Sequence, residues 1–411
     1  MNFKRSDLVL FIFFLNVLVS LTSGVFSSSV MHVGTIRALL MIGLIPLLMI
    51  DRVRLTWAGA MIFICLIYFV IMATFSSNLL RTFDILVKVA ISLLMFVLAY
   101  NYLRGEEARR RLIALVEISL ALFIFSFGLA QIFGIGVNPY AEDGLNPGAG
   151  NIQQTYLIAY FLLFLPLAGF FRGRPFKLHW WEGVLFLLSL FPLVLIARRG
   201  AILGFLAGGV IYAILTAKKA RVVAGVGCAV FLGIVTMPLY IDHVHAVMEH
   251  RTMETEAPNE MGRVQELENS LKVLRDGDIK HALFGQELFN YVEVTRDFRD
   301  LHTDYATYFL GGGLVGFVLY FSIIPALWLD FWRRMPLIPN LYILREVSAV
   351  FIGLTAAYFI ISFSGQYYVI SSLAILFTLW GALLAYVEEL HVPSEETEEI
   401  ETPDMERVDV G

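Results

Sequence analysis

Apolar stretches long enough to cross a lipid bilayer recur along almost the whole chain. A transmembrane helix needs about 20 apolar residues to cross a hydrocarbon core of roughly 30 Å. Twelve stretches approach or exceed this length: 8–26, 35–50, 57–76, 84–103, 112–134, 152–171, 181–197, 200–217, 222–241, 303–329, 347–363 and 369–387. With 58% hydrophobic and only 16% charged residues, the composition excludes an ordinary soluble domain. We therefore expect an all-α integral membrane protein with about twelve transmembrane helices.

Lysine and arginine residues near the ends of these spans predict the orientation of the chain. If Met1 is cytoplasmic, seventeen of them lie inside and only four outside, namely Arg37, Arg81, Arg198 and Arg199. Because basic side chains concentrate in cytoplasmic loops, this asymmetry predicts that both termini are cytoplasmic. The same rule accounts for the basic loops without nucleic acid as a partner.

The predicted spans divide the chain into four parts. Residues 1–241 hold the first nine transmembrane helices and begin with a retained signal anchor, because no small-residue cleavage site follows the first span. Residues 242–301 form one large loop on the outer side, and residues 302–390 hold the last three helices. Residues 391–411 are rich in glutamate and poor in apolar side chains, which predicts a disordered cytoplasmic tail.

The large outer loop contains a candidate amphipathic helix. Asn259 can cap its start, and Gly277 can follow its end near Arg275. Its apolar residues recur at steps of three and four: Met261, Val264, Leu267, Leu271 and Leu274. Arg263 and Ser270 fall on another face. We therefore expect the apolar face to lie on the membrane surface or on the helix bundle, with Arg263 directed toward the space above the lipid.

Glycines recur at four-residue steps after the Arg198-Arg199 turn and again beyond His302, both at the outer boundary of the membrane. They are Gly200, Gly204, Gly208, Gly312 and Gly316. Small residues at this spacing let transmembrane helices approach closely, so packing is their first expected role. If the two rows face each other, they also bring Arg199 and His302 together.

Four short motifs follow one another within residues 138–330. They are Asn146-Pro147 with Asn151-Ile152-Gln153-Gln154; Ala197-Arg198-Arg199-Gly200-Ala201; Met261-Gly262-Arg263 with Leu283-Phe284-Gly285; and His302-Thr303-Asp304-Tyr305 with Gly313 and Leu314-Val315-Gly316. In this order, and within a chain of about twelve spans, they resemble the Asn-Pro-Asn entry, the Arg-Gly turn, the Gly-Arg loop and the His…Gly-x-x-Gly signature of the O-antigen ligase and polymerase superfamily.

This resemblance implies a fold and an activity. Members of the superfamily are GT-C-like membrane glycosyltransferases that act on the periplasmic side of the bacterial inner membrane. They transfer a glycan from undecaprenyl pyrophosphate to an acceptor sugar without a cofactor or a nucleotide-sugar donor. The acceptor is lipid A-core in the ligases and another lipid-linked glycan in the polymerases. Thr303 stands where many ligases have Asn, and the polymerase branch shares this pattern, so both acceptors remain open, with ligase our first choice.

The resemblance also assigns roles to individual residues. Arg199 and Arg263, with Arg198 as a helper, would bind the pyrophosphate, because a guanidinium binds phosphate bidentately and stays charged. His302 would take the proton of the acceptor hydroxyl, since imidazole titrates near neutral pH. Asp304 would either orient His302 or compete with it as the base.

Gln153 and Gln154, at the outer entrance of the sixth span, are candidates for binding sugar hydroxyls. A metal site is not expected from the spacing of the other histidines, which matches no strong metal signature.

Other buried charges have simpler explanations. Asp84 and Lys88 lie one helical turn apart and can pair, which reduces the cost of burying them. Glu117 is expected to pair with the basic cluster 109–111. A secondary transporter for a lipid-linked glycan is the alternative class, but transporters show repeated halves and polar sites near the membrane midplane. Here we find no internal repeat, and the polar motifs lie at the outer boundary.

Overall fold

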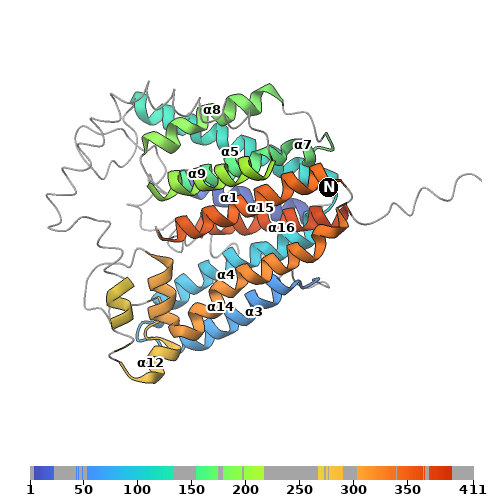
Figure 1. The fold of residues 1–411 in the computed structure, drawn as a ribbon. Helices are drawn as coiled ribbons and strands as arrows, with labels where there is room; N and C mark the ends of the chain where they lie inside the picture. The colour runs from blue at the N-terminus through green and yellow to red at the C-terminus, as the bar shows by residue number, and fades with distance from the viewer. Residues whose placement is uncertain are drawn as a thin grey trace, which may run out of the picture.

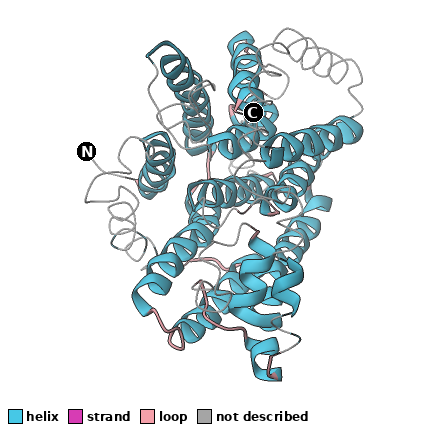
Figure 2. Ribbon diagram, turned by 90° about the vertical axis from the view of Figure 1, so that its left-hand side faces the viewer, coloured by secondary structure: helices cyan, strands magenta, loops and turns pink. Residues whose placement is uncertain are grey.

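The structure is a computed structural model of the whole chain. It describes residues 4–22, 43, 45, 49, 53–133, 154–174, 179–196, 199–216, 267–272, 275, 277–289, 303–338, 340–363, 365 and 370–390. Within these residues the secondary structure is helical and no strand occurs, as Figure 2 shows. The helices, labelled as in Figure 1, are α1 (Arg5–Thr22), α3 (Trp57–Ala73), α4 (Leu79–Tyr102), α5 (Glu106–Phe133), α6 (Gln154–Phe164), η1 (Leu165–Leu167), α7 (Ala168–Phe171), α8 (Trp180–Leu195), α9 (Arg199–Thr216), α12 (Ile279–Phe284), α14 (Asp304–Arg334), η2 (Met335–Leu337), α15 (Leu341–Ser362) and α16 (Ile370–Glu389).

Six helical segments within the described residues are long and apolar enough to cross a membrane. They are α4, α5, the continuous run α6–η1–α7, α14, α15 and α16. The shorter apolar helices α3, α8 and α9 accompany them. All of these coincide with predicted spans. Of the predicted span 35–50 only residues 43, 45 and 49 are described, and the predicted span 222–241 lies outside the description. The described part is thus that of a helical membrane protein, as predicted, and the number twelve stays a prediction.

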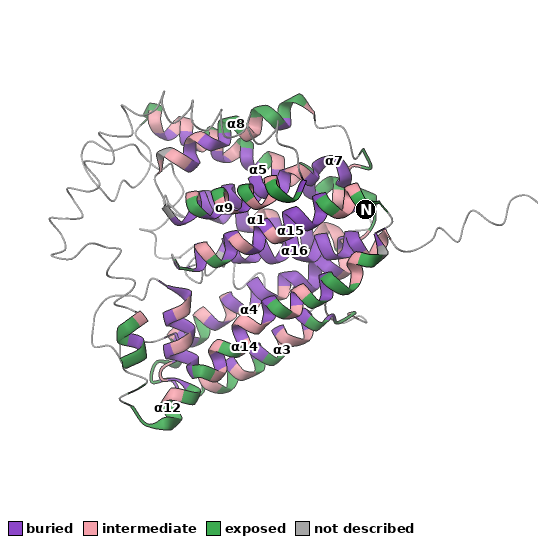
Figure 3. Cartoon of the chain, in the orientation of Figure 1, coloured by how far each residue is buried: buried purple, intermediate pink, exposed green. Residues whose placement is uncertain are grey.

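The helices α6 and α16 lie at the centre of the bundle. Every residue of α6 is buried, and Figure 3 shows the buried positions concentrated along α16 and its neighbours. Gly381 lets α16 approach α4 closely, because a Cβ there would lie 2.5 Å from the Phe96 carbonyl oxygen. The outer helices expose large apolar side chains, such as Ile67 of α3 and Phe125 of α5. A helix apolar on all sides suits the centre, and exposed apolar side chains suit contact with lipid.

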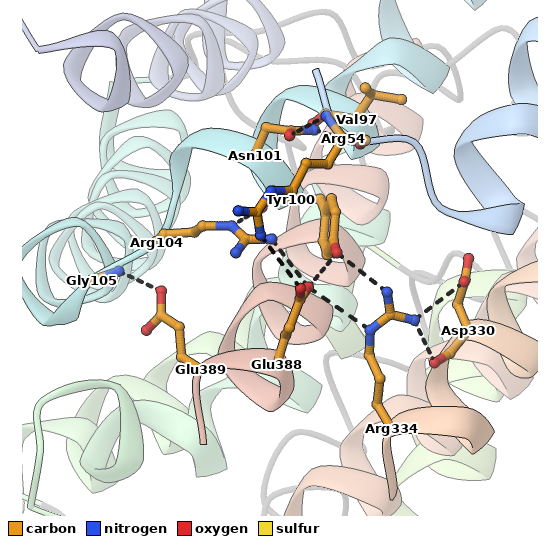
Figure 4. A network of polar contacts seen from close by, with 10 residues as sticks. All are labelled: Arg54, Val97, Tyr100, Asn101, Arg104, Gly105, Asp330, Arg334, Glu388 and Glu389. Atoms are coloured by element: carbon orange, nitrogen blue, oxygen red, sulfur yellow. Dashed lines mark hydrogen bonds and ion pairs between the residues drawn. The ribbon is translucent and has the colours of Figure 1, made fainter. Parts of the chain in front are cut away.

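Ion pairs join several of the segments predicted to be cytoplasmic at one end of the bundle. Near the start of α1, Lys4 pairs with Glu107 at 3.1 Å and Asp7 pairs with Arg111 at 2.5 Å. The contacts of Figure 4 extend this network to the ends of α4, α14 and α16. The structure therefore gathers at one end segments that the charge pattern assigned to one side of the membrane.

Glu388, near the end of α16, is the hub of the contacts in Figure 4. Its carboxylate accepts a hydrogen bond from the Tyr100 hydroxyl and pairs with Arg104 at 3.1 Å, Arg54 at 3.8 Å and Arg334 at 3.8 Å. Three cations from three segments therefore share one carboxylate, so this side chain holds these segments together at one end of the bundle.

Asp330 fastens the start of α3 to the same network. Its carboxylate accepts from the backbone N–H of Trp57 at 3.2 Å and of Ala58 at 2.8 Å, and it pairs with Arg334 at 3.2 Å. The first N–H groups of a helix have no hydrogen-bond partner within the helix, and the helix start carries a partial positive charge. A carboxylate there accepts the hydrogen bonds and balances this charge. The Asp330 side chain is buried and links the start of α3 to the end of α14.

Glu117 has a different partner from the one predicted. Its carboxylate pairs with Arg172, just beyond α7, and Arg172 also pairs with the buried Glu182 of α8. The expected pairing with the cluster 109–111 is wrong, and Arg109 pairs instead with Glu389. On a helix only residues three or four positions apart face each other, and the cluster lies farther than that from Glu117.

We expect Glu388→Gln to lower the midpoint of thermal unfolding of the purified protein in detergent. The substitution removes the charge shared by Arg54, Arg104 and Arg334 and weakens the hydrogen bonds that Tyr100 and Arg104 donate to it. Hydrogen bonds to charged groups contribute about 1.5–3 kcal/mol each. The matched control is Glu106→Gln, which removes the half-exposed pair with Arg110 at the start of α5. Such pairs contribute about 0–1 kcal/mol, so equal shifts in the two variants would contradict a hub role for Glu388.

Candidate active site

The start of α14 places the second half of the His302-Thr303-Asp304-Tyr305 motif inside the protein. Thr303 caps the helix: its side chain accepts from the backbone N–H of Ala306 at 3.1 Å, and its carbonyl accepts from the Thr307 hydroxyl at 2.9 Å. Asp304 follows in the first turn, where the helix dipole favours a negative charge. Both Thr303 and Asp304 are almost completely buried, with 1% and 0% exposed surface.

A glycine bends α14 ten residues after its cap. Gly313 has φ +63° and ψ −168°, far from helical values, and Figure 1 shows the two parts of α14 running in different directions. A Cβ at Gly313 would lie 2.5 Å from the carbonyl oxygen of Leu283. Glycine is therefore required here for two reasons, the left-handed φ and the close approach of another backbone segment.

The segment 283–289, which includes the Leu283-Phe284-Gly285 motif at the end of α12, packs into this bend. The N–H of Gln286 donates to the Leu310 carbonyl at 2.9 Å. The Tyr68 hydroxyl of α3 lies within hydrogen-bonding distance of two carbonyls, that of Gly312 at 2.6 Å and that of Phe284 at 3.2 Å. Two motifs separated in the sequence, the Leu-Phe-Gly turn and the Gly-x-x-Gly element, are thus in direct contact.

The same segment is tied to the connection between α3 and α4. The Glu287 carboxylate accepts from the Ser76 hydroxyl at 2.9 Å and from the Ser77 N–H at 2.9 Å. The Leu288 carbonyl accepts from the Thr82 hydroxyl at 3.0 Å. Glu287 and Phe289 both have positive φ, at 51° and 59°. Such conformations are strained for residues other than glycine, and the surrounding contacts hold them in place.

Three buried tyrosines that belong to none of the sequence motifs lie near Asp304. Tyr308 and Tyr320 stack with ring centroids 3.7 Å apart, and Tyr358 of α15 lies close to both. The hydroxyls of all three are near enough to Asp304 for electrostatic interaction. The only signal in the sequence is the spacing of Tyr305 and Tyr308 after Asp304, which is equally typical of a packed helix.

The last turns of α15 link the start of α14 to the start of α9. The Tyr305 hydroxyl donates to the Phe359 carbonyl at 3.0 Å. On the other side, a Cβ at Gly204 of α9 would lie 2.9 Å from the Ile361 side chain. Since α9 begins at Arg199, just over one turn before Gly204, the starts of both helices border the same end of α15.

The two glycine rows do not pack against each other. A Cβ at Gly208 would lie 2.8 Å from the carbonyl oxygen of Gly353 in α15, whereas one at Gly316 would lie 2.9 Å from the Tyr68 ring of α3. These glycines of the two rows therefore do not face each other, and the closeness of Arg199 and His302 stays a prediction. Close approach requires small residues on either helix, but their spacing does not specify which helix they meet.

The described residues include only part of the predicted site. Gln154 is buried at the start of α6, where its amide donates to the Ser20 carbonyl at 3.4 Å. Asp304 lies as described above, and Arg199 is the first residue of α9. The remaining predicted site residues lie outside the described part of the chain: Arg198, Gln153, Arg263 and His302.

The predicted loop helix is helical where the structure describes it, at residues 267–272 and 275. Ser270 is buried, with 1% exposed surface, whereas Leu271 is 47% exposed. Ser270 therefore contacts the rest of the protein. Leu267 of the predicted apolar face is half-buried and Leu271 is exposed, so the surface on which this face lies, membrane or bundle, stays a prediction.

The pairing predicted within α4 is confirmed. The Lys88 ammonium donates to the Asp84 carboxylate at 2.5 Å, one turn earlier in the helix. Each charge is satisfied by the other, so a structural role accounts for both.

The fold is that of a helical membrane protein. Its candidate site, formed by the start of α14 and the segment 283–289, is polar, partly buried and lies at the end of the bundle opposite the ion-pair network. Residues 184–321 match the family model described as O-antigen ligase. The match runs from α8 to the second part of α14 and supports the predicted resemblance to the O-antigen ligase and polymerase superfamily. No curated protein shows significant sequence similarity to the chain.

Proposed function

We propose that this protein is an O-antigen ligase-like glycosyltransferase. It moves a glycan from undecaprenyl pyrophosphate to a sugar hydroxyl of lipid A-core on the periplasmic face of the bacterial inner membrane. The observation that carries this proposal is the family match over residues 184–321, which includes three of the four sequence motifs. Within it, the described parts of the last two motifs lie in contact, and the second of them includes the buried Asp304.

The leaving group determines which residues the reaction needs. As the bond between the anomeric carbon and the phosphate oxygen breaks, the electron pair stays on the pyrophosphate and negative charge develops there. Arg199 and Arg263, assisted by Arg198, bind this group, since an arginine fork is suited to phosphate. Preorganised donors at a developing charge contribute about 3–4 kcal/mol each. Gln153 and Gln154 are assigned to sugar hydroxyls.

His302 acts as the base that takes the proton from the acceptor hydroxyl as its oxygen attacks the anomeric carbon. Asp304 acts as a positioning residue, because a carboxylate with no exposed surface among tyrosines is poorly placed to meet a sugar. It adjoins the histidine in the chain and stabilises the start of α14. One displacement of this kind inverts the configuration at the anomeric carbon, and a retained configuration would exclude it.

The polymerase remains the second candidate, because Thr303 follows the histidine and both enzymes use the same donor. The acceptor then is another lipid-linked glycan. A transporter is less well supported, because alternating access requires the inner ends of the helices to separate. Here Glu388 and Asp330 tie the inner ends of α3, α4, α14 and α16 together.

A strain lacking the gene tests the proposal, with lipopolysaccharide separated from undecaprenyl-linked glycan on gels. We expect long chains to accumulate on the lipid carrier while the lipopolysaccharide carries bare core, and the gene in trans to restore the normal pattern. Core bearing a single repeat unit would instead identify a polymerase. Lipid-linked units held inside the cell would identify a transporter.

A further inference from the structure

We propose that residues 283–289 and Tyr68 form a clasp that positions the two halves of the catalytic site for glycan transfer. The inference rests on the proposed function and adds residues to which no role has been assigned. The clasp lies within the large outer loop, after the part that carries Arg263. It also holds the first part of α14, which begins directly after His302 and Thr303.

The clasp has three independent anchors. Gln286 N–H and Tyr68 Oη hold it to the first part of α14, at the carbonyls of Leu310 and Gly312. Glu287 holds it to the connection between α3 and α4. Phe289 is the third anchor. Its buried ring packs edge-on against the rings of Phe69 and Tyr308, with centroids 5.9 and 6.0 Å away.

Two glycines make this contact possible from either side. A Cβ at Gly285 would lie 2.5 Å from the Gly311 carbonyl carbon, just as one at Gly313 would meet Leu283. Both residues have positive φ, at +79° and +63°. A side chain at either position would push residues 283–285 away from α14. Only glycine therefore lets the two backbone segments lie this close together.

The position of the clasp explains why it affects chemistry and not only folding. In the proposed reaction Arg263 holds the donor and His302 activates the acceptor, and these residues lie on opposite sides of the clasp in the sequence. A rigid contact between the two segments sets the distance between the reacting groups. A displacement of about 1 Å at such a site lowers the rate about 100-fold.

The test compares the steady-state kinetics of full-length variants in membranes, with lipid-linked glycan and an acceptor as substrates. Gly313→Ala opens the bend, and Tyr68→Phe removes only the bridging hydroxyl. The control is Gly209→Ala in α9, where an added Cβ meets nothing within 4 Å. We expect kcat to fall about 10–100-fold in the clasp variants, with the donor KM, the amount of protein in the membrane and the thermal unfolding midpoint close to wild type for Tyr68→Phe.

A second measurement tests the contact itself without depending on activity. In a chain with Cys65→Ala and Cys228→Ala, the pair Ser77→Cys and Gln286→Cys should react with a short bis-maleimide to give an intramolecular cross-link, detected by mass spectrometry. Both substitutions keep the backbone N–H groups through which these residues take part in the contact. No cross-link would overturn the clasp. A cross-link together with wild-type kcat in both Tyr68→Phe and Gly313→Ala would overturn its positioning role. Absence of transfer by the wild-type protein would instead overturn the proposed function.

Discussion

Replacing His302 with alanine is expected to lower the rate of glycan transfer by about 10²–10⁴-fold, the contribution typical of a general base. The acceptor hydroxyl is a weak nucleophile at neutral pH, so losing the proton acceptor raises the barrier to attack. Binding of the donor does not need the imidazole, and the KM for the lipid-linked glycan should change little. The measurement is transfer from purified lipid-linked glycan in membranes with matched amounts of protein.

Two comparisons make this result specific. His281→Ala removes an exposed histidine of α12 and should leave the rate unchanged. Asp304→Asn keeps the size of the buried side chain and removes its charge, so a positioning role predicts a smaller loss than that of His302→Ala. If Asp304→Asn caused the larger loss and His302→Ala kept wild-type activity, Asp304 would be the base.

Replacing Arg263 with alanine is expected to lower transfer by about 10²–10³-fold, the usual effect of removing one donor from a developing negative charge. Arg263→Lys should recover only part of the rate, because an ammonium keeps the charge but lacks the planar fork that binds two phosphate oxygens. The same transfer assay measures both variants, with the donor concentration varied to separate kcat from KM.

An arginine elsewhere in the same outer loop provides the control. Arg275 is exposed, and Arg275→Ala should transfer glycan at the wild-type rate. An equal loss in Arg275→Ala would mean that the loop needs positive charge in general and not a guanidinium at position 263. Full activity of Arg263→Ala would remove this residue from the pyrophosphate site.

The positions of the described apolar helices along the chain could be predicted from the sequence. The predicted span 57–76 corresponds to α3 (Trp57–Ala73), and the predicted span 303–329 to α14 (Asp304–Arg334). Long apolar runs report burial in lipid or protein without any knowledge of their neighbours. The pairing of Asp84 with Lys88 was also predictable, because side chains four positions apart on a helix lie next to each other whatever the rest of the fold.

The neighbours of each helix were decided only by the tertiary structure. Gly208 packs against Gly353 of α15 and not against the glycines of α14. Glu117 pairs with Arg172 and not with the basic cluster 109–111, which is nearer in the sequence. The tyrosines around Asp304 come from α14 and α15, whose closeness no local pattern contains. A helix apolar on nearly every side has no face that identifies its partner, so non-local packing selects it. The sequence by itself therefore determined the helices and the order of the motifs, and packing between helices determined how the site is assembled.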